Sequence, residues 1–285
     1  ISFFHFIAIA AAASFLLVPK AFADQTSLFK ADTTVKYIES CSRAPFDSYE
    51  NWLQVISRGS LNRADRSNIP EAKKGAFVEA NLSRFKVSFP ESLYNKFKAE
   101  MLCNTFEYEV EGEMVIGYVM QSKEARNSPV LIYNRGGNGN FGAVIFATLM
   151  NTIYPMADRG FTVIGTQYRG TFKRGTEHSD QFGGDDVKDV VALNKIIQQL
   201  HNVDTSKIGM FGTSRGAMQT LLALQEMDNI NAAAILAGNY NLEKGLSYRP
   251  EMEEVFKKRI PNYEENKSFE LKKRSAVNWV DKLPK

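Results

Sequence analysis

The segment at residues 207–224, KIGMFGTSRGAMQTLLAL, constrains the fold more strongly than any other part of the chain. It starts with the short apolar run IGMF at 208–211, which is typical of a buried strand. A turn with a glycine at each end follows at 212–216, and beyond it apolar residues recur at helical spacing with no Gly or Pro to interrupt them. The segment therefore predicts a strand, a tight turn and a helix in immediate succession.

The turn GTSRG has the pattern Gly-x-Ser-x-Gly, with Ser214 at its centre. The two glycines let the chain reverse where strand and helix approach each other, so the turn projects the Ser214 hydroxyl beyond the strand. The N–H groups that open the helix point toward whatever binds there. Chance alone would give the bare pentapeptide in roughly one chain of this length in ten. The flanking strand and helix patterns favour a nucleophilic Ser214 over an inert serine in a glycine-rich turn.

The composition is that of an ordinary globular protein. Of the 285 residues, 44% are apolar and 24% are charged, and the formal net charge is +3 at pH 7. A chain of this length can bury one large core with a small appendage. The nearly balanced charge gives no reason to expect a nucleic acid or an acidic surface as partner.

Residues 1–23 have the pattern of a signal peptide. Residues 3–18 form an apolar block, and the small-residue pattern AFA follows it, so cleavage would leave Asp24 at the N-terminus. A membrane anchor is the alternative, but the block is short for a span and no other stretch is long and apolar enough. We therefore expect export to a periplasm or beyond, with no stable membrane span after cleavage. Because the sequence starts at Ile1 rather than Met, we also expect its true start to lie upstream.

Cys41 and Cys103 are the only cysteines in the chain. An oxidising compartment permits a disulfide between them. Two separate buried thiols are the alternative, since free Cys is among the residue types most often buried. The sequence leaves both possibilities open.

Two regions differ in their patterning. Residues 24–104 are typical of a small helical extension, because FDSYENWLQVISR at 46–58 has its apolar residues on one helical face. From residue 105 a β-hairpin is indicated, and between 129 and 237 apolar strands alternate with helices. This alternation predicts an α/β domain at 105–285, with a mainly parallel sheet covered by helices on both faces.

Three motifs in the second region resemble the prolyl oligopeptidase family of serine peptidases, which has the α/β-hydrolase fold. They are GTSRGA around Ser214, the loop and helix start YRGT…FGGDDVKDV at 168–190, and the pair Gly136 and Gly137 after the strand at 129–133. The resemblance implies acyl transfer through Ser214. It also implies an oxyanion hole formed by the N–H of Arg215 and by the loop that contains Gly136 and Gly137.

The sequence departs from the pattern of that family at Arg135. The family places a tyrosine there, which donates a hydrogen bond to the oxyanion. With Arg135 in its place, backbone N–H groups would have to do more of that work. The departure leaves esterase-type chemistry open beside peptide cleavage.

A second departure is that the acid and the base are missing. Serine needs a base, which an acid orients, and in α/β-hydrolases the acid and then the histidine follow the serine. The only histidines are His5, His178 and His201, and none of them follows Ser214. His201 is expected at the end of a helix and His178 in a polar surface loop.

Residues 274–285 resemble the segment that, in this family, leads into the strand before the catalytic acid. We therefore expect the sequence to be a fragment, incomplete at its C-terminus, with the catalytic Asp and His beyond Lys285. A natural pseudoenzyme that kept the turn and lost the base is the alternative.

The sequence thus favours an exported serine hydrolase, in the first place a peptidase that acts on short peptides through an acyl-enzyme at Ser214. A carboxylic-ester hydrolase with the same site, or a non-catalytic binding module with this fold, are the alternatives. No metal or other cofactor is expected, because Asp185, Asp186 and Asp189 have no Cys or His at ligand spacing and no P-loop or Rossmann glycine pattern is present. Side-chain specificity, exopeptidase or endopeptidase mode and oligomeric state are not specified by these patterns.

Overall fold

The computed structural model describes residues 27–173 and 180–283. The predicted signal peptide at 1–23 lies outside the described residues, and so do His5 and His178. No helix in the described part of the chain is long and apolar enough to span a membrane.

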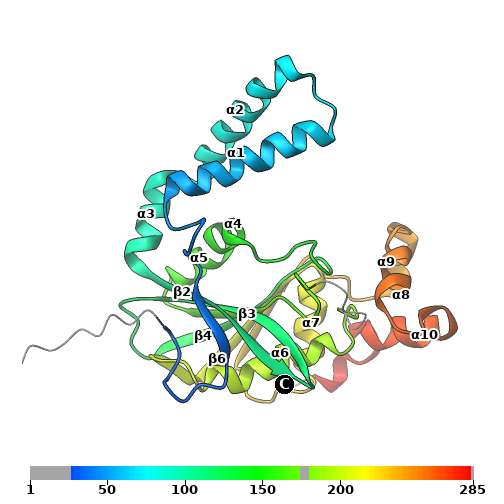
Figure 1. Cartoon of the computed structure of the whole chain (residues 1–285). Helices are drawn as coiled ribbons and strands as arrows, with labels where there is room; N and C mark the ends of the chain where they lie inside the picture. Colours follow the sequence, from blue (N-terminus) through cyan, green and yellow to red (C-terminus); the bar gives the residue numbers. More distant parts are fainter. Residues whose placement is uncertain (1–26, 174–179, 284–285) are drawn as a thin grey trace, which may run out of the picture.

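A seven-stranded sheet organises the described residues (Figure 1). In spatial order its strands are β1 (Lys36–Ser40), β2 (Met101–Val110), β3 (Glu113–Ser122), β5 (Thr162–Thr166), β4 (Ser128–Asn134), β6 (Val203–Thr213) and β7 (Ala232–Leu236). The pairs from β1 to β5 are antiparallel, whereas β5, β4, β6 and β7 run parallel. The predicted parallel sheet is therefore present, and an antiparallel meander extends it on one side.

The meander is continuous because β2 and β3 form a tight hairpin, as the sequence indicates. Their register pairs Val110 with Glu113, so Glu111 and Gly112 alone make the turn. Both turn residues have positive φ, 53° and 81°, as a type I′ turn requires. This turn matches the right-handed twist of the two strands and fixes their register.

Helices cover both faces of the sheet, in agreement with the predicted α/β class. On one face α6 (Asp186–Ile197) and α7 (Arg215–Ala223) bury their apolar sides against the inward residues of β4 and β6, such as Ile132 and Met210. On the other face a short helical segment packs on the sheet. That segment consists of α4 (Phe146–Thr148), the π-helical turn Leu149–Ile153 and α5 (Tyr154–Ala157). The sequence predicts a single helix at roughly 142–158, whereas the structure divides it into these three parts.

The helical N-terminal extension predicted for residues 24–104 is present, and the region also contains a strand. Strand β1 belongs to the sheet and pairs with β2, and β2 starts at Met101, so the predicted boundary at 104/105 falls inside a strand. The helical part consists of α1 (Tyr49–Arg66), α2 (Glu71–Ser88) and α3 (Glu91–Glu100). In Figure 1, α1 and α2 form a hairpin that projects away from the sheet, and we call residues 42–100 the arm.

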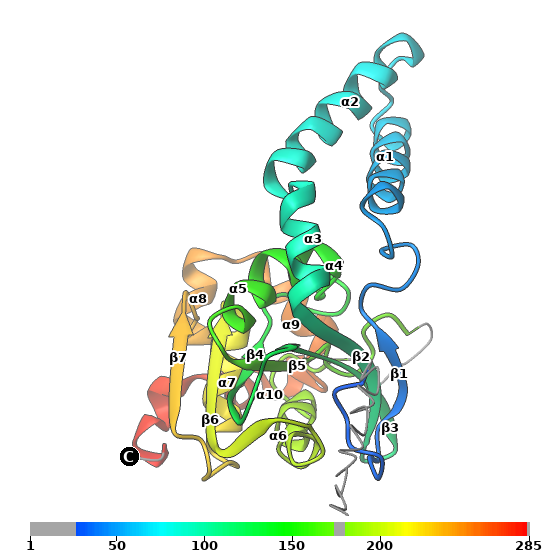
Figure 2. The same cartoon turned by 90° about the vertical axis from the view of Figure 1, so that its left-hand side faces the viewer.

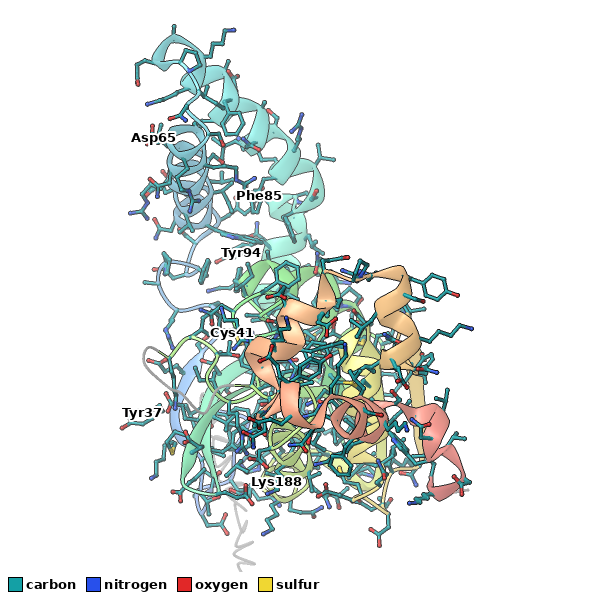
Figure 3. All side chains as sticks on the ribbon, turned by 90° about the vertical axis from the view of Figure 1, so that its right-hand side faces the viewer. Tyr37, Cys41, Asp65, Phe85, Tyr94 and Lys188 are labelled. Carbon is teal, nitrogen blue, oxygen red and sulfur yellow. A yellow bond between two sulfur atoms is a disulfide. The ribbon has the colours of Figure 1, made fainter. Side chains whose placement is uncertain are left out.

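The base of the arm is fixed by an aromatic cluster around Trp52, which is 1% exposed. Its ring lies 4.7 Å from that of Phe85 on α2 and 4.8 Å from that of Phe146 on the sheet domain, both edge-on. Such edge-to-face pairs add about 1 kcal/mol each beyond the area that they bury. Trp52 thus packs the hairpin and the domain together, while the far end of the arm has no such contact with the sheet (Figure 3).

Cys41 and Cys103 form a disulfide, with a Cα–Cα distance of 5.4 Å. Cys41 directly precedes the arm, and Cys103 lies in β2, just after it. The backbone N–H of Cys41 also donates to the carbonyl oxygen of Cys103 at 3.0 Å. The bridge therefore closes the arm at its base.

The C-terminal residues 240–283 add three helices beside the sheet (Figure 1). They are α8 (Leu242–Tyr248), α9 (Met252–Arg259) and α10 (Tyr263–Arg274), followed by 3-10 turns at Ala276–Asn278 and Val280–Lys282. Leu242, Phe256 and Leu271 bury one side of this group in the core. In Figure 2, β7 forms the edge of the sheet next to these helices, and all five of its residues are exposed.

Candidate active site

Ser214 occupies a sharp turn between β6 and α7, as the sequence predicts. β6 ends at Thr213 and α7 begins at Arg215, so Ser214 is the single residue between them. Its φ of 54° and ψ of −121° place a non-glycine residue in a sparsely populated region of backbone conformation. The N–H of Ser214 donates to the carbonyl oxygen of Leu236 at 2.9 Å, which anchors the turn to the end of β7.

The loop at 136–142, which we call the oxyanion loop, follows β4 and lies beside this turn. β4 and β6 are parallel neighbours, with Asn134 paired to Gly212, so their carboxyl ends meet at the same edge of the sheet. A Cβ atom built on Gly136 would lie 3.2 Å from Cβ of Ser214 and 3.8 Å from its Oγ. Of the predicted oxyanion residues, Gly136 and Arg215 are thus both neighbours of Ser214.

Gly137 gives the oxyanion loop its tight curvature. Its φ is +74°, and a Cβ atom there would lie 2.1 Å from the carbonyl oxygen of Phe141. No residue with a side chain fits this position without moving the backbone. The loop therefore folds back on itself, with its first residues next to Ser214.

Arg135 does not face the reacting position. Its side chain is 1% exposed, and burial lowers the pKa of its guanidinium. The acceptors of its N–H groups, at 2.6–3.2 Å, are the carbonyl oxygens of Gly136, Gly139, Phe141 and Gln167 and the hydroxyl of Thr171. All three guanidinium nitrogens thus donate hydrogen bonds within the protein, so Arg135 holds the shape of the oxyanion loop rather than donating to an oxyanion.

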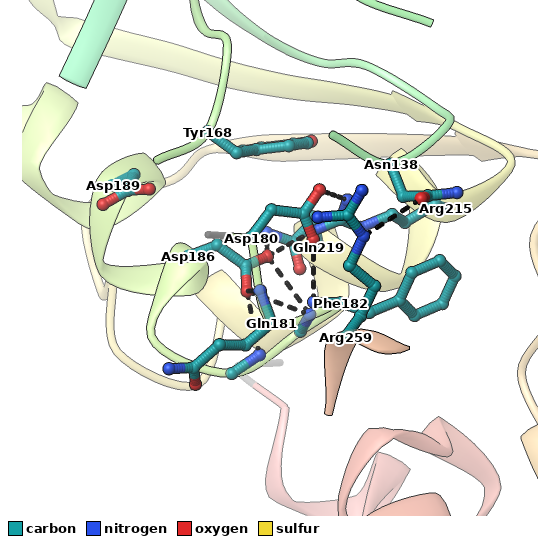
Figure 4. Close-up of polar contacts among 12 residues, drawn as sticks. Asn138, Tyr168, Asp180, Gln181, Phe182, Asp186, Asp189, Arg215, Gln219 and Arg259 are labelled. Carbon is teal, nitrogen blue, oxygen red and sulfur yellow. Dashed lines mark hydrogen bonds and ion pairs between the residues drawn. The ribbon is translucent and has the colours of Figure 1, made fainter. Parts of the chain in front are cut away.

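The side chain of Arg215, the residue after Ser214, lies in a buried ionic cluster with Asp180 and Asp186 (Figure 4). Its Nη1 lies 2.5 Å from Asp180 Oδ2 and its Nη2 lies 2.5 Å from Asp186 Oδ2. Burial alone would lower the pKa of Arg215, but the two carboxylates outweigh it and raise that pKa. Burial likewise works to raise the pKa of Asp180, whereas Arg215 and two backbone N–H groups hold it below its ordinary value.

Sequence reasoning missed this cluster. The sequence pattern assigns Asp186 only to the helix start in FGGDDVKDV, and it does not single out Asp180. Their separation from Arg215 is 35 and 29 positions, so no local period relates them. A neighbouring buried ion pair joins Arg169 to Asp189 of α6 at 2.7 Å.

A cavity of about 400 Å³ opens beside Ser214, between the sheet domain and the helices α8 and α9. Its wall is chiefly apolar, with a few polar groups such as Asn138 and Arg249. The apolar lining comprises Phe141, Phe182, Met218, Leu242, Leu246, Tyr248, Met252 and Phe256. A concave apolar site with few polar groups next to a candidate nucleophile is typical of a substrate pocket.

The described residues place no histidine next to Ser214. His201 precedes β6 and Ser214 follows it, so the two lie at opposite ends of the same strand. His178 is outside the described residues. Within 27–173 and 180–283 there is also no group of three or more His, Cys, Asp or Glu side chains that could hold a metal ion.

Comparison with known proteins gives matches over the same region. Residues 147–283 match the model of the prolyl oligopeptidase family. The uncharacterized peptidase YtmA of Bacillus subtilis is 28% identical over 181 residues, which are 63% of this chain and 68% of that protein. The resemblance to this family is thereby confirmed, and the match includes the motifs at 168–190 and around Ser214.

Solved structures confirm the predicted α/β-hydrolase fold. A puromycin-hydrolyzing peptidase of Mycobacterium tuberculosis superposes with a TM-score of 0.52 at 22% identity, over 64% of this chain and 30% of that one. An acylaminoacyl peptidase of Pyrococcus horikoshii superposes with a TM-score of 0.51 at 20% identity, over 67% of this chain and 32% of that one. The chain therefore spans about a third of the length of these two solved peptidases.

Proposed function

We propose that this chain, whose residues 147–283 match the model of the prolyl oligopeptidase family, acts as a serine hydrolase on substrates with a bulky apolar acyl group. The observation that carries the proposal is the position of Ser214, at a strained turn between the oxyanion loop and the apolar cavity. The cavity is at the small end of ligand pockets, which suits one aromatic or branched aliphatic group rather than a long chain.

In this proposal Ser214 Oγ attacks the carbonyl carbon of the substrate. A base takes the serine proton and passes it to the leaving amine or alcohol, and water then hydrolyses the acyl-enzyme. The negative charge on the carbonyl oxygen is met by backbone N–H groups. The proposed donors are the N–H of Arg215, in the first turn of α7, and those of Gly136 and Gly137 in the oxyanion loop.

Peptides are the first candidate substrates, because the matched family and the Bacillus subtilis relative are peptidases. Esters are the second candidate, and Arg135 favours them. Its guanidinium nitrogens are all engaged by the protein, so the oxyanion receives backbone donors only. Each missing donor costs about 3 kcal/mol of transition-state stabilisation, and an ester, with its better leaving group, tolerates that loss better than an amide.

Export remains part of the proposal. The disulfide between Cys41 and Cys103 supports it, because such bonds persist in oxidising compartments and are rare in the cytosol. A short peptide or ester that reaches the periplasm or the outside of the cell would then be the substrate.

Two pairs of substrates test the proposal, with the full-length gene product as the unaltered protein. We expect 4-nitrophenyl 4-phenylbutyrate to react faster than 4-nitrophenyl acetate by about 10- to 100-fold in kcat/KM, since each methylene-sized contact in an apolar pocket contributes about 1–3 kcal/mol. Comparing phenylalanine 4-nitroanilide with the matching ester separates peptidase from esterase. Ser214→Ala abolishes both reactions.

Leu246→Trp is the variant that tests the cavity itself. Leu246 lines the cavity from α8, so a larger side chain should fill it and remove the preference for the bulky acyl group while acetyl transfer is kept. Equal rates for both acyl groups in the unaltered protein would refute the proposed acyl preference. If the protein binds phenylbutyrate but neither hydrolyses the esters nor reacts with a fluorophosphonate, the result would instead support a non-catalytic binding module.

A further inference from the structure

The side chain of Arg215 is linked to the oxyanion loop by one direct hydrogen bond and by a second connection through Asp180. Its Nη1 donates directly to the carbonyl oxygen of Gly137 at 3.0 Å. The same Nη1 lies 2.5 Å from Asp180 Oδ2, and that oxygen accepts the N–H of Gly139 at 2.7 Å. One guanidinium, on the residue that follows Ser214, therefore connects the nucleophile turn to the loop beside it.

The guanidinium itself has a fixed position. It lies between two aromatic rings, with Cζ 4.7 Å from the ring centroid of Tyr168 and 4.8 Å from that of Phe182. Asp186, which is fully buried, accepts from its other terminal nitrogen and from backbone N–H groups such as that of Gly183. Both terminal nitrogens of this buried guanidinium are paired with carboxylates, so it resists displacement, because any other arrangement leaves a charge unpaired out of water.

The oxyanion loop needs such a connection because of its composition. Gly137, Gly139 and Gly142 all have positive φ, and glycine backbones lose the most conformational freedom when they are fixed. Arg135 ties the loop to the end of β5 through Gln167. Those contacts fix its curvature, and Arg215 adds a side-chain hydrogen bond from the nucleophile turn to Gly137.

We propose that Arg215 is a positioning residue, whose side chain holds the oxyanion loop at the distance from Ser214 at which the N–H groups of the loop meet the developing oxyanion. Its catalytic meaning rests on the proposed hydrolase function. The mechanical part, that Arg215 orders the loop, is independent of that function. A displacement of about 1 Å in such a loop costs on the order of 10²-fold in rate.

Arg215→Lys tests the proposal, because lysine keeps the charge but cannot contact Gly137, Asp180 and Asp186 at once. The matched control is Arg169→Lys. The side chain of Arg169 is buried like that of Arg215, but its hydrogen bonds go to Asp189 rather than to residues 136–142. If Arg215→Lys fails to fold, Asp180→Asn replaces it, since this change weakens the contact with Gly139 and keeps the pair between Arg215 and Asp186.

The first readout is the affinity for 2-phenylethylboronic acid, followed by ¹¹B NMR. Ser214 Oγ donates a lone pair to boron and releases its proton to solvent, and the tetrahedral adduct places an oxygen where the oxyanion forms. We expect Arg215→Lys to weaken this binding by about 100-fold and to lower kcat more than it raises KM. The affinity of Arg215→Lys for 3-phenylpropanol, which enters the cavity without forming an adduct, should stay within twofold of that of the unaltered protein. Arg169→Lys should bind both compounds with the affinities of the unaltered protein.

The second readout is hydrogen exchange of the amides at 137–141, which needs no chemistry at Ser214. Faster exchange there in Arg215→Lys, but not in Arg169→Lys, supports the proposal. Unchanged boronate affinity and exchange in Arg215→Lys, or equal losses in both variants, would overturn it. If the unaltered protein does not bind the boronate, the proposed function fails, and the exchange experiment alone decides whether Arg215 orders the loop.

Discussion

A Cβ atom on Gly216 would lie 1.9 Å from the carbonyl oxygen of Asn134, so the first turn of α7 passes directly over the end of β4. The contact is between two backbones, and neither can give way as a flexible side chain could. We expect Gly216→Ala to lower the free energy of unfolding by about 3 kcal/mol, as overpacking of a close backbone contact does. It should also separate Ser214 from the oxyanion loop. Urea denaturation and fluorophosphonate labelling measure the two effects.

Gly59→Ala is the matched control for that substitution. Gly59 lies within α1, and a Cβ atom there would meet nothing within 4 Å. Alanine is a better helix former than glycine by about 1 kcal/mol, so this variant should be more stable than the unaltered protein and equally reactive. Two variants of equal stability would contradict the close approach of α7 and β4.

The strand, turn and helix around Ser214 were predictable because each of them has a recognisable pattern in its own short stretch of sequence. Apolar runs of strand length and a Gly-x-Ser-x-Gly turn are read within a few residues, and strand–helix alternation indicates a parallel sheet. β1 has no such local pattern. Its residues KYIES are mostly exposed, and it pairs with β2 across more than 60 intervening residues. Edge strands that are held by a distant partner have no apolar alternation to reveal them.

The candidate site shows the same limit. Ser214 and Gly136 come from motifs, but the function of the Arg215 side chain depends on Asp180 and Asp186, which meet it only after folding. A single arginine beside a serine looks the same in sequence whether it is exposed or buried. Ion pairs between distant segments have no period, so only the structure could bring these three residues together.

Removing the disulfide between Cys41 and Cys103 should loosen the arm. The bond joins residues 62 positions apart, and the chain-entropy treatment gives a loss of about 4 kcal/mol when it is absent. We expect the variant with Cys41→Ala and Cys103→Ala to melt at a lower temperature and to be cleaved by trypsin first within the arm. Reductant should have the same effect on the unaltered protein and none on the variant. Equal cleavage rates with and without reductant would show that Trp52 and its neighbours hold the arm alone.

Asp189 should make stability depend on pH in an unusual direction. Burial raises the pKa of this carboxyl to about 7, against the opposing effect of Arg169, and Asp186 nearby adds to the rise. The folded protein then binds one proton more than the unfolded chain between about pH 4 and pH 7. The contribution of Asp189 to stability is therefore complete below pH 4, falls as the pH rises toward 7 and is lost above it.

The measurement is the slope of unfolding free energy against pH. Between pH 4 and pH 7, the free energy of unfolding of the unaltered protein should fall with rising pH by about 1 kcal/mol per pH unit more than that of Asp189→Asn. The comparison uses slopes, so the general destabilisation caused by leaving Arg169 without its carboxylate does not affect it. Parallel curves for the two proteins would mean that Arg169 keeps Asp189 ionised throughout the window.

The base that activates Ser214 is the subject of the last prediction. Sequence order in α/β-hydrolases places the histidine after the serine, and this sequence has none there, while His201 lies at the far end of β6. An oxyanion hole and a pocket alone give about 10³- to 10⁴-fold over water, and the nucleophile–base unit is worth on the order of 10⁶. Residues 24–285 alone should thus hydrolyse 4-nitrophenyl esters barely above background and react slowly with a fluorophosphonate. His178→Ala and His201→Ala should change these rates less than twofold, whereas Ser214→Ala removes the labelling. Fast labelling that His178→Ala silences would show instead that the loop before α6 supplies the base.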